Sequence, residues 1–294
     1  MANLPLVSVI IPTRDRAELL RGAVEAVLAQ THPELDVIIV DDGSGDHTPD
    51  VVAGFVADRR VRALRNEESA GAAAARNAGA EVARGEILLF EDDDCRGEPE
   101  RVEKLIRALA PRTDAAYAFC HSRRVMASGD VVIKGDEGPW SIGTPAALIR
   151  AAAFREAGGF DPSLPRLQDF DLWTRLLVRR PAVEVPEVLY EAVWDDVGIS
   201  ASDKGLLEAE QYLYRKYDTD EMPASHLSAM HRRLGGKLML AGHWGRGLTH
   251  FRRAVSACRW CPRSWAALVA GLAGPAVYRR VVGATRPSGA MGTA

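Results

Sequence analysis

Short apolar runs alternate with segments of helical periodicity over the first hundred residues. The apolar runs are rich in Val, Ile and Leu and predict buried strands over 6–11, 37–40, 61–64 and 86–90. Between and after them, apolar positions recur at helical spacing and predict helices over 19–28, 48–57, 72–83 and 98–109. Continuous apolar strands that alternate with helices indicate an α/β fold, with a mostly parallel central sheet flanked by helices.

The pattern changes after residue 110. Short strands are predicted over 115–119, 122–126 and 130–134, and one or two more over 182–193. Helices are predicted over 145–157 and 168–178. From residue 203 onward only helical patterns remain, over 206–217, 225–241, 246–257 and 264–282, which indicates a C-terminal helical appendage.

Composition narrows the functional classes. The 294 residues carry a formal net charge of −3, which gives no reason to expect a nucleic acid partner. The first residues lack the basic and apolar regions of a secretory signal, and no uncharged apolar run reaches the roughly 18 residues of a spanning helix. We therefore expect a cytoplasmic protein whose cysteines stay reduced.

Basic residues and tryptophans gather in the C-terminal helices. Trp244, Trp260 and Trp265 lie among ten basic residues between positions 232 and 280. This composition suits peripheral contact with the inner face of a membrane. The alternative, which we favour on sequence alone, is the solvated face of a helical bundle.

Polar residues follow three of the predicted strands at their carboxyl ends. These groups are Pro12-Thr13-Arg14-Asp15, Asp41-Asp42-Gly43-Ser44 and Glu91-Asp92-Asp93-Asp94. Because the carboxyl ends of parallel strands lie along one edge of a sheet, the groups should converge where open α/β sheets bind ligands. Four consecutive carboxylates repel one another, and Mg²⁺ or Mn²⁺ with phosphate oxygens in its shell would neutralise them. Helix capping by Asp94 accounts for only one of the four.

Asp42 and Arg14 each allow two interpretations. Asp42 accepts an N–H from a nucleobase, or it forms an Asx turn before Gly43. Arg14 stacks its guanidinium on a base, or it pairs with Asp15 at the surface. The chain has neither a GxGxxG motif after the first strand nor a P-loop, which excludes those two kinds of phosphate site.

Four runs together resemble the inverting family 2 glycosyltransferases. They are VSVIIPTRD (7–15), IIVDDGSGD (38–46), GAAAARNAGAEVARGEILLFEDDD (71–94) and GGFDPSLPRLQDFDL (158–172), in the family's order and spacing. The resemblance implies a glycosyltransferase-A fold, a nucleotide-diphosphate sugar donor and a bound Mn²⁺ or Mg²⁺. It also implies transfer to an acceptor hydroxyl, on a saccharide, a lipid-linked saccharide or a small molecule.

The resemblance also implies site residues. Donor binding falls to Pro12, Thr13, Arg14, Asp42, Gly71, Arg76 and Asp92. Asp93 and Glu91 match the metal segment, with Asp93 as the direct ligand, and Asp169 matches the catalytic base. From spacing alone, Asp169 would equally serve as a first-turn acid of the helix predicted over 168–178.

A further metal ligand is expected after the last strand. Members of the family often place a His there, and this chain has Asp195 and Asp196 instead. We expect one of these two acids, Asp195 first, to take that place. The alternative is a turn with surface acids.

The chain departs from the family pattern in several places. Arg14 and Asp15 stand where Tyr and Asn are common, and Glu91 replaces the usual first Asp. The Gln-x-x-Arg-Trp signature of processive members is missing after Trp173, which favours transfer of a single sugar.

We predict three functional parts from these assignments. They are a nucleotide-sugar-binding subdomain (1–98), an acceptor-binding and catalytic-base subdomain (99–202) and a helical C-terminal region (203–294). Two other functions stay open as alternatives. A sugar-nucleotide pyrophosphorylase would need a glycine-rich basic loop after the first strand, and a non-catalytic module would bind nucleotide sugar without turnover.

Overall fold

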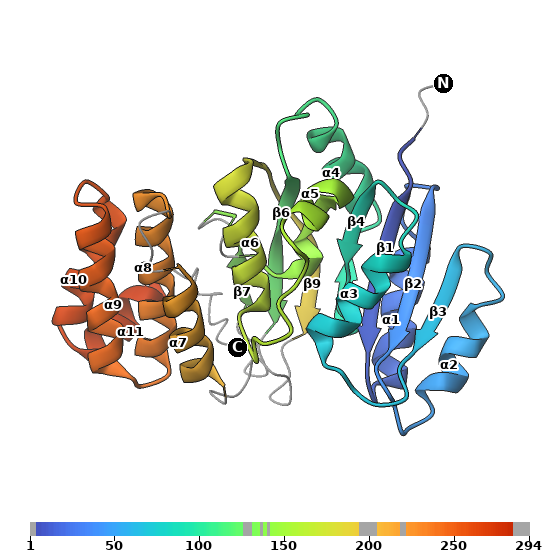
Figure 1. The fold of residues 1–294 in the computed structure, drawn as a ribbon, viewed down its shortest axis with the longest axis horizontal. Helices are drawn as coiled ribbons and strands as arrows, with labels where there is room; N and C mark the ends of the chain where they lie inside the picture. The colour runs from blue at the N-terminus through green and yellow to red at the C-terminus, as the bar shows by residue number, and fades with distance from the viewer. Residues whose placement is uncertain are drawn as a thin grey trace, which may run out of the picture. The chain divides into compact units, whose positions relative to one another are not determined.

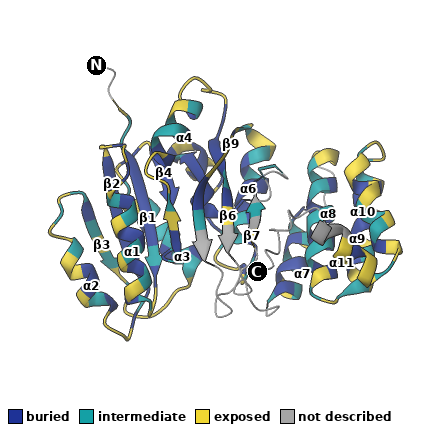
Figure 2. Ribbon diagram, turned by 180° about the vertical axis from the view of Figure 1, so that it is seen from behind, coloured by how far each residue is buried: buried dark blue, intermediate teal, exposed yellow. Residues whose placement is uncertain are grey.

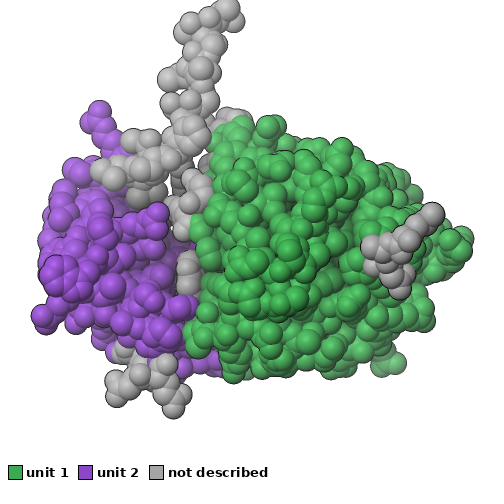
Figure 3. Space-filling model, turned by 90° about the horizontal axis from the view of Figure 1, so that it is seen from above, with its two compact units in different colours: residues 1–163, 168–195 green, residues 164–167, 196–294 purple. Residues whose placement is uncertain are grey.

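The protein divides into two compact units. The computed structural model describes residues 4–125, 131–135, 138–139, 142–193, 205–217 and 222–284. Residues 1–163 and 168–195 form the first unit, and residues 164–167 and 196–294 form the second (Figure 3). The division into three functional parts stays a prediction.

A nine-stranded sheet forms the centre of the first unit (Figure 1). Its strand order is β3-β2-β1-β4-β8-β6-β9-β5, and β7 pairs with β6. The strands β1 to β4 run parallel to one another, as the continuous apolar runs predict, and β6 is parallel to β9. The bounds are β1 Val7–Thr13, β2 Leu35–Asp41, β3 Val61–Arg65, β4 Ile87–Phe90, β5 Cys95–Gly97, β6 Tyr117–Val125, β7 Val131–Lys134, β8 Ala147–Arg150 and β9 Ala182–Val193.

Helices α1 to α6 complete the first unit. Their bounds are α1 Ala17–Leu28, α2 Thr48–Phe55, α3 Ala72–Val82, α4 Arg101–Leu109, α5 Ala151–Glu156 and α6 Gln168–Arg179. Val9, Ile38 and Leu88 are at most 1% exposed, so the strand interiors form the core (Figure 2). Gly79 lets α3 pack closely on β1, because an added Cβ there would lie 2.4 Å from Ile10 Cγ2.

The helix expected over 145–157 is wrong in its first half. Thr144–Ala146 form a 3₁₀ turn, Ala147–Arg150 form β8, and the α-helix covers only Ala151–Glu156. Strand β8 lies antiparallel between β4 and β6, and its first three residues are fully buried. Pairing on both sides of β8 outweighs the helical preference of its sequence.

Two further strands differ from the expectation. The strands expected over 115–119 and 122–126 are one strand, β6, whose register against β9 shifts between Cys120 and Ser122. The shift leaves Pro186 of β9 outside the register, which suits a residue without an N–H to donate. The short strand β5 pairs with β9 and is not predicted, because three residues are too few to show a periodicity.

Helices are the regular elements of the second unit in its described residues. They are α7 Leu206–Tyr217, α8 Ala224–Leu240, α9 Trp244–Ala257, α10 Pro262–Leu272 and α11 Pro275–Ala284. The single helix expected over 264–282 is two helices, because Gly274 takes a φ of 109° and Pro275 begins α11. Within the described residues, no helix is long and apolar enough to cross a membrane.

A buried polar chain links α7, α8 and α9. His250 Nε2 lies 2.7 Å from Glu210 Oε1, and His250 Nδ1 lies 2.9 Å from Nδ1 of His231. Both histidines are 1% exposed. Buried polar groups are tolerated when they find partners, and here each histidine finds one across a helix interface.

The substitution Gly79→Ala tests the packing of α3 on β1. It is expected to lower the free energy of unfolding by about 1–3 kcal/mol, because the methyl group must displace the stiff side chain of Ile10. Gly54→Ala is the control, since a Cβ on this exposed residue of α2 meets nothing within 4 Å. The free energy of unfolding of this control should rise by about 0.5–1 kcal/mol. Urea unfolding measures both variants, and equal effects would contradict the close packing.

Candidate active site

The carboxyl ends of β1, β2 and β4 meet at one edge of the sheet. The N–H of Asp42 donates to the carbonyl of Thr13 at 2.9 Å, and the N–H of Glu91 donates to the carbonyl of Ile10 at 2.9 Å. Thr13 Oγ1 donates to Asp93 Oδ2 at 2.8 Å. Half-buried Pro12 lies at the end of β1, paired with β2. The three polar groups therefore lie together, as expected for parallel strands.

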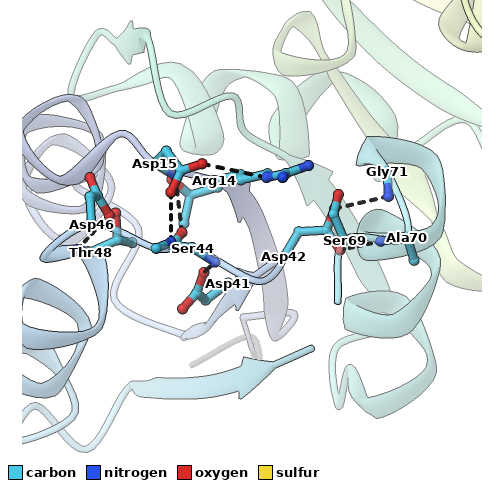
Figure 4. Close-up of polar contacts among 12 residues, drawn as sticks. Arg14, Asp15, Asp41, Asp42, Ser44, Asp46, Thr48, Ser69, Ala70 and Gly71 are labelled. Carbon is cyan, nitrogen blue, oxygen red and sulfur yellow. Dashed lines mark hydrogen bonds and ion pairs between the residues drawn. The ribbon is translucent and has the colours of Figure 1, made fainter. Parts of the chain in front are cut away.

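Asp15 joins the loops that follow β1 and β2 (Figure 4). Its N–H donates to Ser44 Oγ at 3.0 Å, and its Oδ1 accepts the N–H of Gly45 at 2.7 Å. These bonds hold Asp15 at a left-handed φ of 53°, which aspartate tolerates better than most residues. Arg14 Nε lies 3.5 Å from Asp15 Oδ2, and the Arg14 side chain is 55% exposed. The guanidinium of Arg14 is therefore open to solvent beside this junction.

Asp42 accepts four hydrogen bonds from the segment 66–71, and Figure 4 labels the partners Ser69, Ala70 and Gly71. Asn66 Nδ2 and Ser69 Oγ donate at 2.7 Å, and the N–H groups of Ala70 and Gly71 donate at 2.9 Å. Burial raises the pKa of Asp42, but these hydrogen bonds outweigh burial and hold the pKa below its usual value. Gly71 has a φ of 87° and immediately precedes α3, so the carboxylate lies at the positive end of that helix.

Glu91 forms a buried ion pair. Its side chain is 1% exposed and pairs with the fully buried guanidinium of Arg101 in α4. Arg101 also donates to the carbonyl of Pro145 at 2.9 Å. The carboxylate that the sequence assigns to metal binding therefore already has a cationic partner within the chain.

Asp93 and Asp94 share one arginine, Arg16. Arg16 Nη1 lies 3.1 Å from Asp93 Oδ1 and 3.1 Å from Asp94 Oδ2. Burial raises the pKa of Asp93 to about 6, although Arg16 opposes the shift. Burial and the charge of Asp92 also raise the pKa of Asp94. The two carboxylates thus carry their charges at a cost in free energy, which additional positive charge would relieve.

Asp92 is held by Arg76 of α3. Arg76 Nη2 donates to Asp92 Oδ1 at 2.6 Å, and Arg76 Nη1 lies 3.5 Å from Gln168 Oε1. The same guanidinium lies 5.5 Å from the ring centroid of Phe160. Arg76 therefore connects the acidic segment after β4 to the beginning of α6, far away in the sequence.

A group of potential metal ligands lies in the same segment. Ligand atoms of Asp92, Asp94 and Cys95 all lie within 4.8 Å of one another. Asp92 and Asp94 are partly exposed, whereas Cys95 is buried. The predicted metal ligands Asp93 and Glu91 lie outside this group, and their carboxylates pair with Arg16 and Arg101.

Asn77 fixes the segment that leads toward α6. Its Nδ2 donates to the carbonyl of Phe160 at 2.8 Å, and its Oδ1 accepts the N–H of Phe160 at 2.9 Å. A Cβ on Gly159 would lie 2.8 Å from Asn77 Oδ1, so this contact also depends on a glycine. Arg76 and Asn77, neighbours on α3, thus both reach the second half of the first unit.

Asp169 lies in the first turn of α6, as the sequence predicts. It is half-buried, and its Oδ1 accepts the N–H of Phe170 at 2.7 Å. Two residues earlier, Leu167 has a left-handed φ of 64°. A non-glycine residue in this conformation is strained, and such strain is frequent at functional sites.

Two other acids of this region bond to neighbouring residues of the fold, and two more lie outside the described residues. Asp171 is fully buried and accepts from Arg175 Nε at 2.9 Å. Asp161 Oδ1 accepts the N–H of Ser163 at 3.0 Å, which is the turn expected from its sequence. Asp195 and Asp196 lie outside the described residues, so the expected metal ligand there stays a prediction.

Arg16 and Arg101 are the arginines of the site that the sequence reasoning missed. Arg76 was predicted to bind the donor, and the structure shows that it also bonds to Asp92. We expected a metal cation to offset the repulsion among the four carboxylates. In the structure, these arginines offset it. The clustered negative charge was the one sequence signal for these arginines. It shows that cations are needed nearby but not which residues supply them.

Comparison with known sequences gives one family. Residues 8–140 match the glycosyl transferase family 2. The chain is 29% identical over 225 residues to TuaG of Bacillus subtilis, a glycosyltransferase named for teichuronic acid biosynthesis, and the match covers 73% of this chain and 89% of TuaG. Glycosyltransferase GlyG of Streptococcus pneumoniae is 38% identical over 105 residues, which is 35% of each chain.

Solved structures show the same fold. TarS 1-349 of S. aureus in complex with UDP-GlcNAc matches with a TM-score of 0.69 at 16% identity, covering 95% of this chain and 91% of that one. The mannosyltransferase PcManGT of Pyrobaculum calidifontis in complex with GDP-Man and Mn²⁺ matches with a TM-score of 0.59 at 19% identity, covering 97% and 84%. Residues 8–140 therefore match the family 2 glycosyltransferases, and the chain has a glycosyltransferase-A-like fold. Together with the relatives named as glycosyltransferases, this supports a glycosyltransferase enzyme.

Proposed function

We propose that this enzyme moves a single sugar from a nucleotide-diphosphate sugar to an acceptor hydroxyl, with inversion and with the help of Mn²⁺ or Mg²⁺. One observation carries the proposal. Arg76 bonds to Asp92 in the acidic segment and reaches Gln168, the residue before Asp169. One side chain therefore joins the segment suited to a diphosphate with the segment that offers a base.

The donor complexes of similar folds support this choice of substrate. TarS is described with UDP-GlcNAc and PcManGT with GDP-Man and Mn²⁺. Since the family match and the relatives support a glycosyltransferase, the pyrophosphorylase and the non-catalytic binding module are set aside.

The edge formed by the loops after β1 and β2 is proposed to bind the nucleoside. Pro12 and Thr13 would line it, and Arg14 would cover the base with its exposed guanidinium. Asp42 contributes by holding the segment 66–71, from which it accepts all four of its described hydrogen bonds. This segment ends at Gly71, where the positive end of α3 suits an anionic diphosphate.

Arg76 has an unused donor that fits a phosphate oxygen. Its Nε is buried and has no hydrogen-bond partner in the described structure. Its two terminal nitrogens already hold Asp92 and reach Gln168. A donor phosphate at the acidic segment would satisfy the N–H on Nε, since a buried donor without a partner costs free energy.

The acidic segment fits a hard divalent cation. Asp92 and Asp94 offer oxygen ligands close to each other, and the raised pKa values of Asp93 and Asp94 indicate a need for positive charge. Cys95 is a poor ligand for this ion, because burial raises the pKa of its thiol well above the usual value. When bound, the cation would neutralise the diphosphate as it leaves.

The positions and ion pairs of the four carboxylates decide which of them we propose as metal ligands. We propose Asp92 and Asp94 as ligands, with Asp93 as the next carboxylate in reach. Glu91 is the weakest candidate, because its carboxylate is buried against Arg101. Asp195 stays a predicted additional ligand.

Asp169 is proposed as the general base. The acceptor oxygen attacks the anomeric carbon from the face opposite the diphosphate, and the bond from that carbon to the phosphate oxygen breaks. The acceptor proton passes to the Asp169 carboxylate as the new bond forms. Asp169 suits this role because it is half-buried at the beginning of α6 and adjoins the residue that Arg76 contacts.

A panel of nucleotide sugars tests the function as a whole. With Mn²⁺ present, the true donor should raise the melting temperature by mass action, and the enzyme should release free nucleoside diphosphate from it. Proton NMR of the product then reports the anomeric configuration. Binding without release, or retention of configuration, would contradict the proposal.

Metal dependence is expected to reside in Asp92 and Asp94. Asp92→Asn and Asp94→Asn should each weaken Mn²⁺ binding by at least about tenfold, since each removes an oxygen ligand charge. Isothermal titration measures the affinity, and diphosphate release with excess EDTA measures the dependence. Asp114→Asn is the control, because its exposed carboxylate pairs with Arg112 away from the site. Full release in EDTA, or unchanged Mn²⁺ affinity in both variants, would remove the metal from the mechanism.

Loss of the base should separate turnover from binding. Asp169→Asn keeps shape and hydrogen bonding but removes basicity, so turnover should fall about 100-fold or more while donor affinity stays near that of the wild type. Asp161→Asn preserves the turn at Ser163 and should retain turnover. Near-normal turnover in Asp169→Asn would show that Asp169 is not the general base and that another carboxylate has this role.

Asp42→Asn should weaken donor binding and destabilise the protein. An amide oxygen cannot replace a carboxylate that accepts four hydrogen bonds, and the loss at neutral pH should be about 2 kcal/mol or more. Because the folded-state pKa of Asp42 is lowered, its stabilisation is fully present above about pH 4 and is lost as the pH falls through the folded pKa.

The stability difference between wild type and Asp42→Asn should therefore shrink on acidification. Urea midpoints over a pH series measure it, with Asp50→Asn in α2 as an exposed control. A difference that grows as the pH falls would show that Asp42 does not act through its charge.

A further inference from the structure

Charge is divided unevenly along the chain. All 40 acidic residues precede residue 222, and 11 of the 37 basic residues follow it. The region from α8 to the C-terminus is thus a basic stretch without a single carboxylate side chain, in a protein whose net charge is −3. Such asymmetry is typical of a surface that meets a polyanion.

An apolar stripe runs along the outer face of α10. Trp265, Val269 and Leu272 follow one another at helical spacing and are 48%, 62% and 59% exposed. The opposite face is packed, because Ser264 is fully buried and Gly271 lies against Phe251 of α9. The stripe is therefore an unpartnered face and not a frayed end of the unit.

Two more exposed apolar side chains lie in the segments before and after α10. Trp260, in the turn before α10, is 93% exposed, and Val277 of α11 is 43% exposed. The indole N–H of Trp265 donates to the carbonyl of Arg259 at 2.9 Å, which fixes that ring at the beginning of the stripe. We call these five residues the outer patch: Trp260, Trp265, Val269, Leu272 and Val277.

Exposed arginines belong to the same elements as the outer patch. Arg259 and Arg263 flank Trp260 in sequence, and Arg279 and Arg280 follow Val277. Within the described residues, none of these four arginines forms an ion pair. Arg253 differs, since its guanidinium lies 4.3 Å from the ring centroid of Tyr214.

We propose that the outer patch and its four arginines dock this enzyme on an anionic phospholipid surface. Tryptophan and aliphatic side chains enter the boundary between headgroups and acyl chains, and arginines pair with lipid phosphates. No helix among the described residues spans a bilayer, so the contact is interfacial. The inference is independent of the donor, the metal and the base proposed above.

A second copy of the chain fits this surface less well. Two identical patches would bring arginines against arginines without any carboxylate in the region to pair with them. The large exposed apolar residues described in the first unit are single and come from separate elements, among them Val56, Val82 and Val178. They offer no counterpart to a continuous apolar stripe, whereas a lipid surface supplies both the apolar layer and the negative charge.

Vesicle binding by the full chain tests the proposal. Cosedimentation compares vesicles of phosphatidylcholine alone with an equal mixture of phosphatidylcholine and phosphatidylglycerol. Binding to the mixed vesicles should be at least about tenfold tighter and should weaken with added salt. Tryptophan emission should shift to shorter wavelength only with the mixed vesicles, since Trp260 and Trp265 leave water.

Two double variants separate the contributions of the patch. Trp265→Ser with Val269→Ser should reduce binding about tenfold or more by removing the apolar contact, and Arg259→Gln with Arg263→Gln should abolish the preference for anionic lipid. Val56→Ser with Arg107→Gln, exposed residues of the first unit, is the matched control and should bind normally. Melting temperatures confirm that all variants fold.

Three results of the vesicle experiments would overturn the proposal. They are equal binding to both kinds of vesicle, a control that loses binding as much as the patch variants, and no binding at all. A self-association that needs no lipid and disappears in Trp265→Ser with Val269→Ser would assign the patch to a second copy instead.

Discussion

Neutralising four consecutive carboxylates at the end of β4 is the constraint on which the rest of the site depends. Arg101 pairs with Glu91, Arg76 with Asp92, and Arg16 with Asp93 and Asp94. These arginines come from α4, from α3 and from the residue before α1. Breaking one such pair leaves a buried charge uncompensated, so the position of each element is tied to the same strand end.

The strand ends could be predicted from sequence because the central residues of these buried strands form apolar runs that stop where the strand leaves the sheet. Thr13, Asp41 and Glu91 mark those points, and parallel pairing brings them together. Residues Ala147–Arg150 could not be recognised as a strand, since the pairing with β4 and β6 that makes them one is tertiary.

The partners of the site residues were less accessible to sequence reasoning. The arginines lie 10 to 78 residues from the carboxylates they bind, and sequence spacing does not report such contacts. Asp42 was predicted as a donor-site residue. The four hydrogen bonds that its carboxylate accepts could not be predicted, because their donors lie in the segment 66–71, more than 20 residues further along the chain. What a sequence shows is the presence of charge at a strand end, whereas the direction of each side chain depends on the packing of distant helices.

The contact between His231 and His250 in the second unit determines which ring nitrogens carry protons. With the two Nδ1 atoms 2.9 Å apart, one N–H must lie between the rings, and one nitrogen must accept it. While Glu210 stays ionised, the Nε2 of His250 is the donor to it, so a neutral His250 must accept through Nδ1 and His231 must donate. Each ring is thereby restricted to one tautomer, and protons at both Nδ1 atoms would force the rings apart. The hydrogen bonds that link α7, α8 and α9 therefore fix which nitrogen of each neutral ring carries its proton.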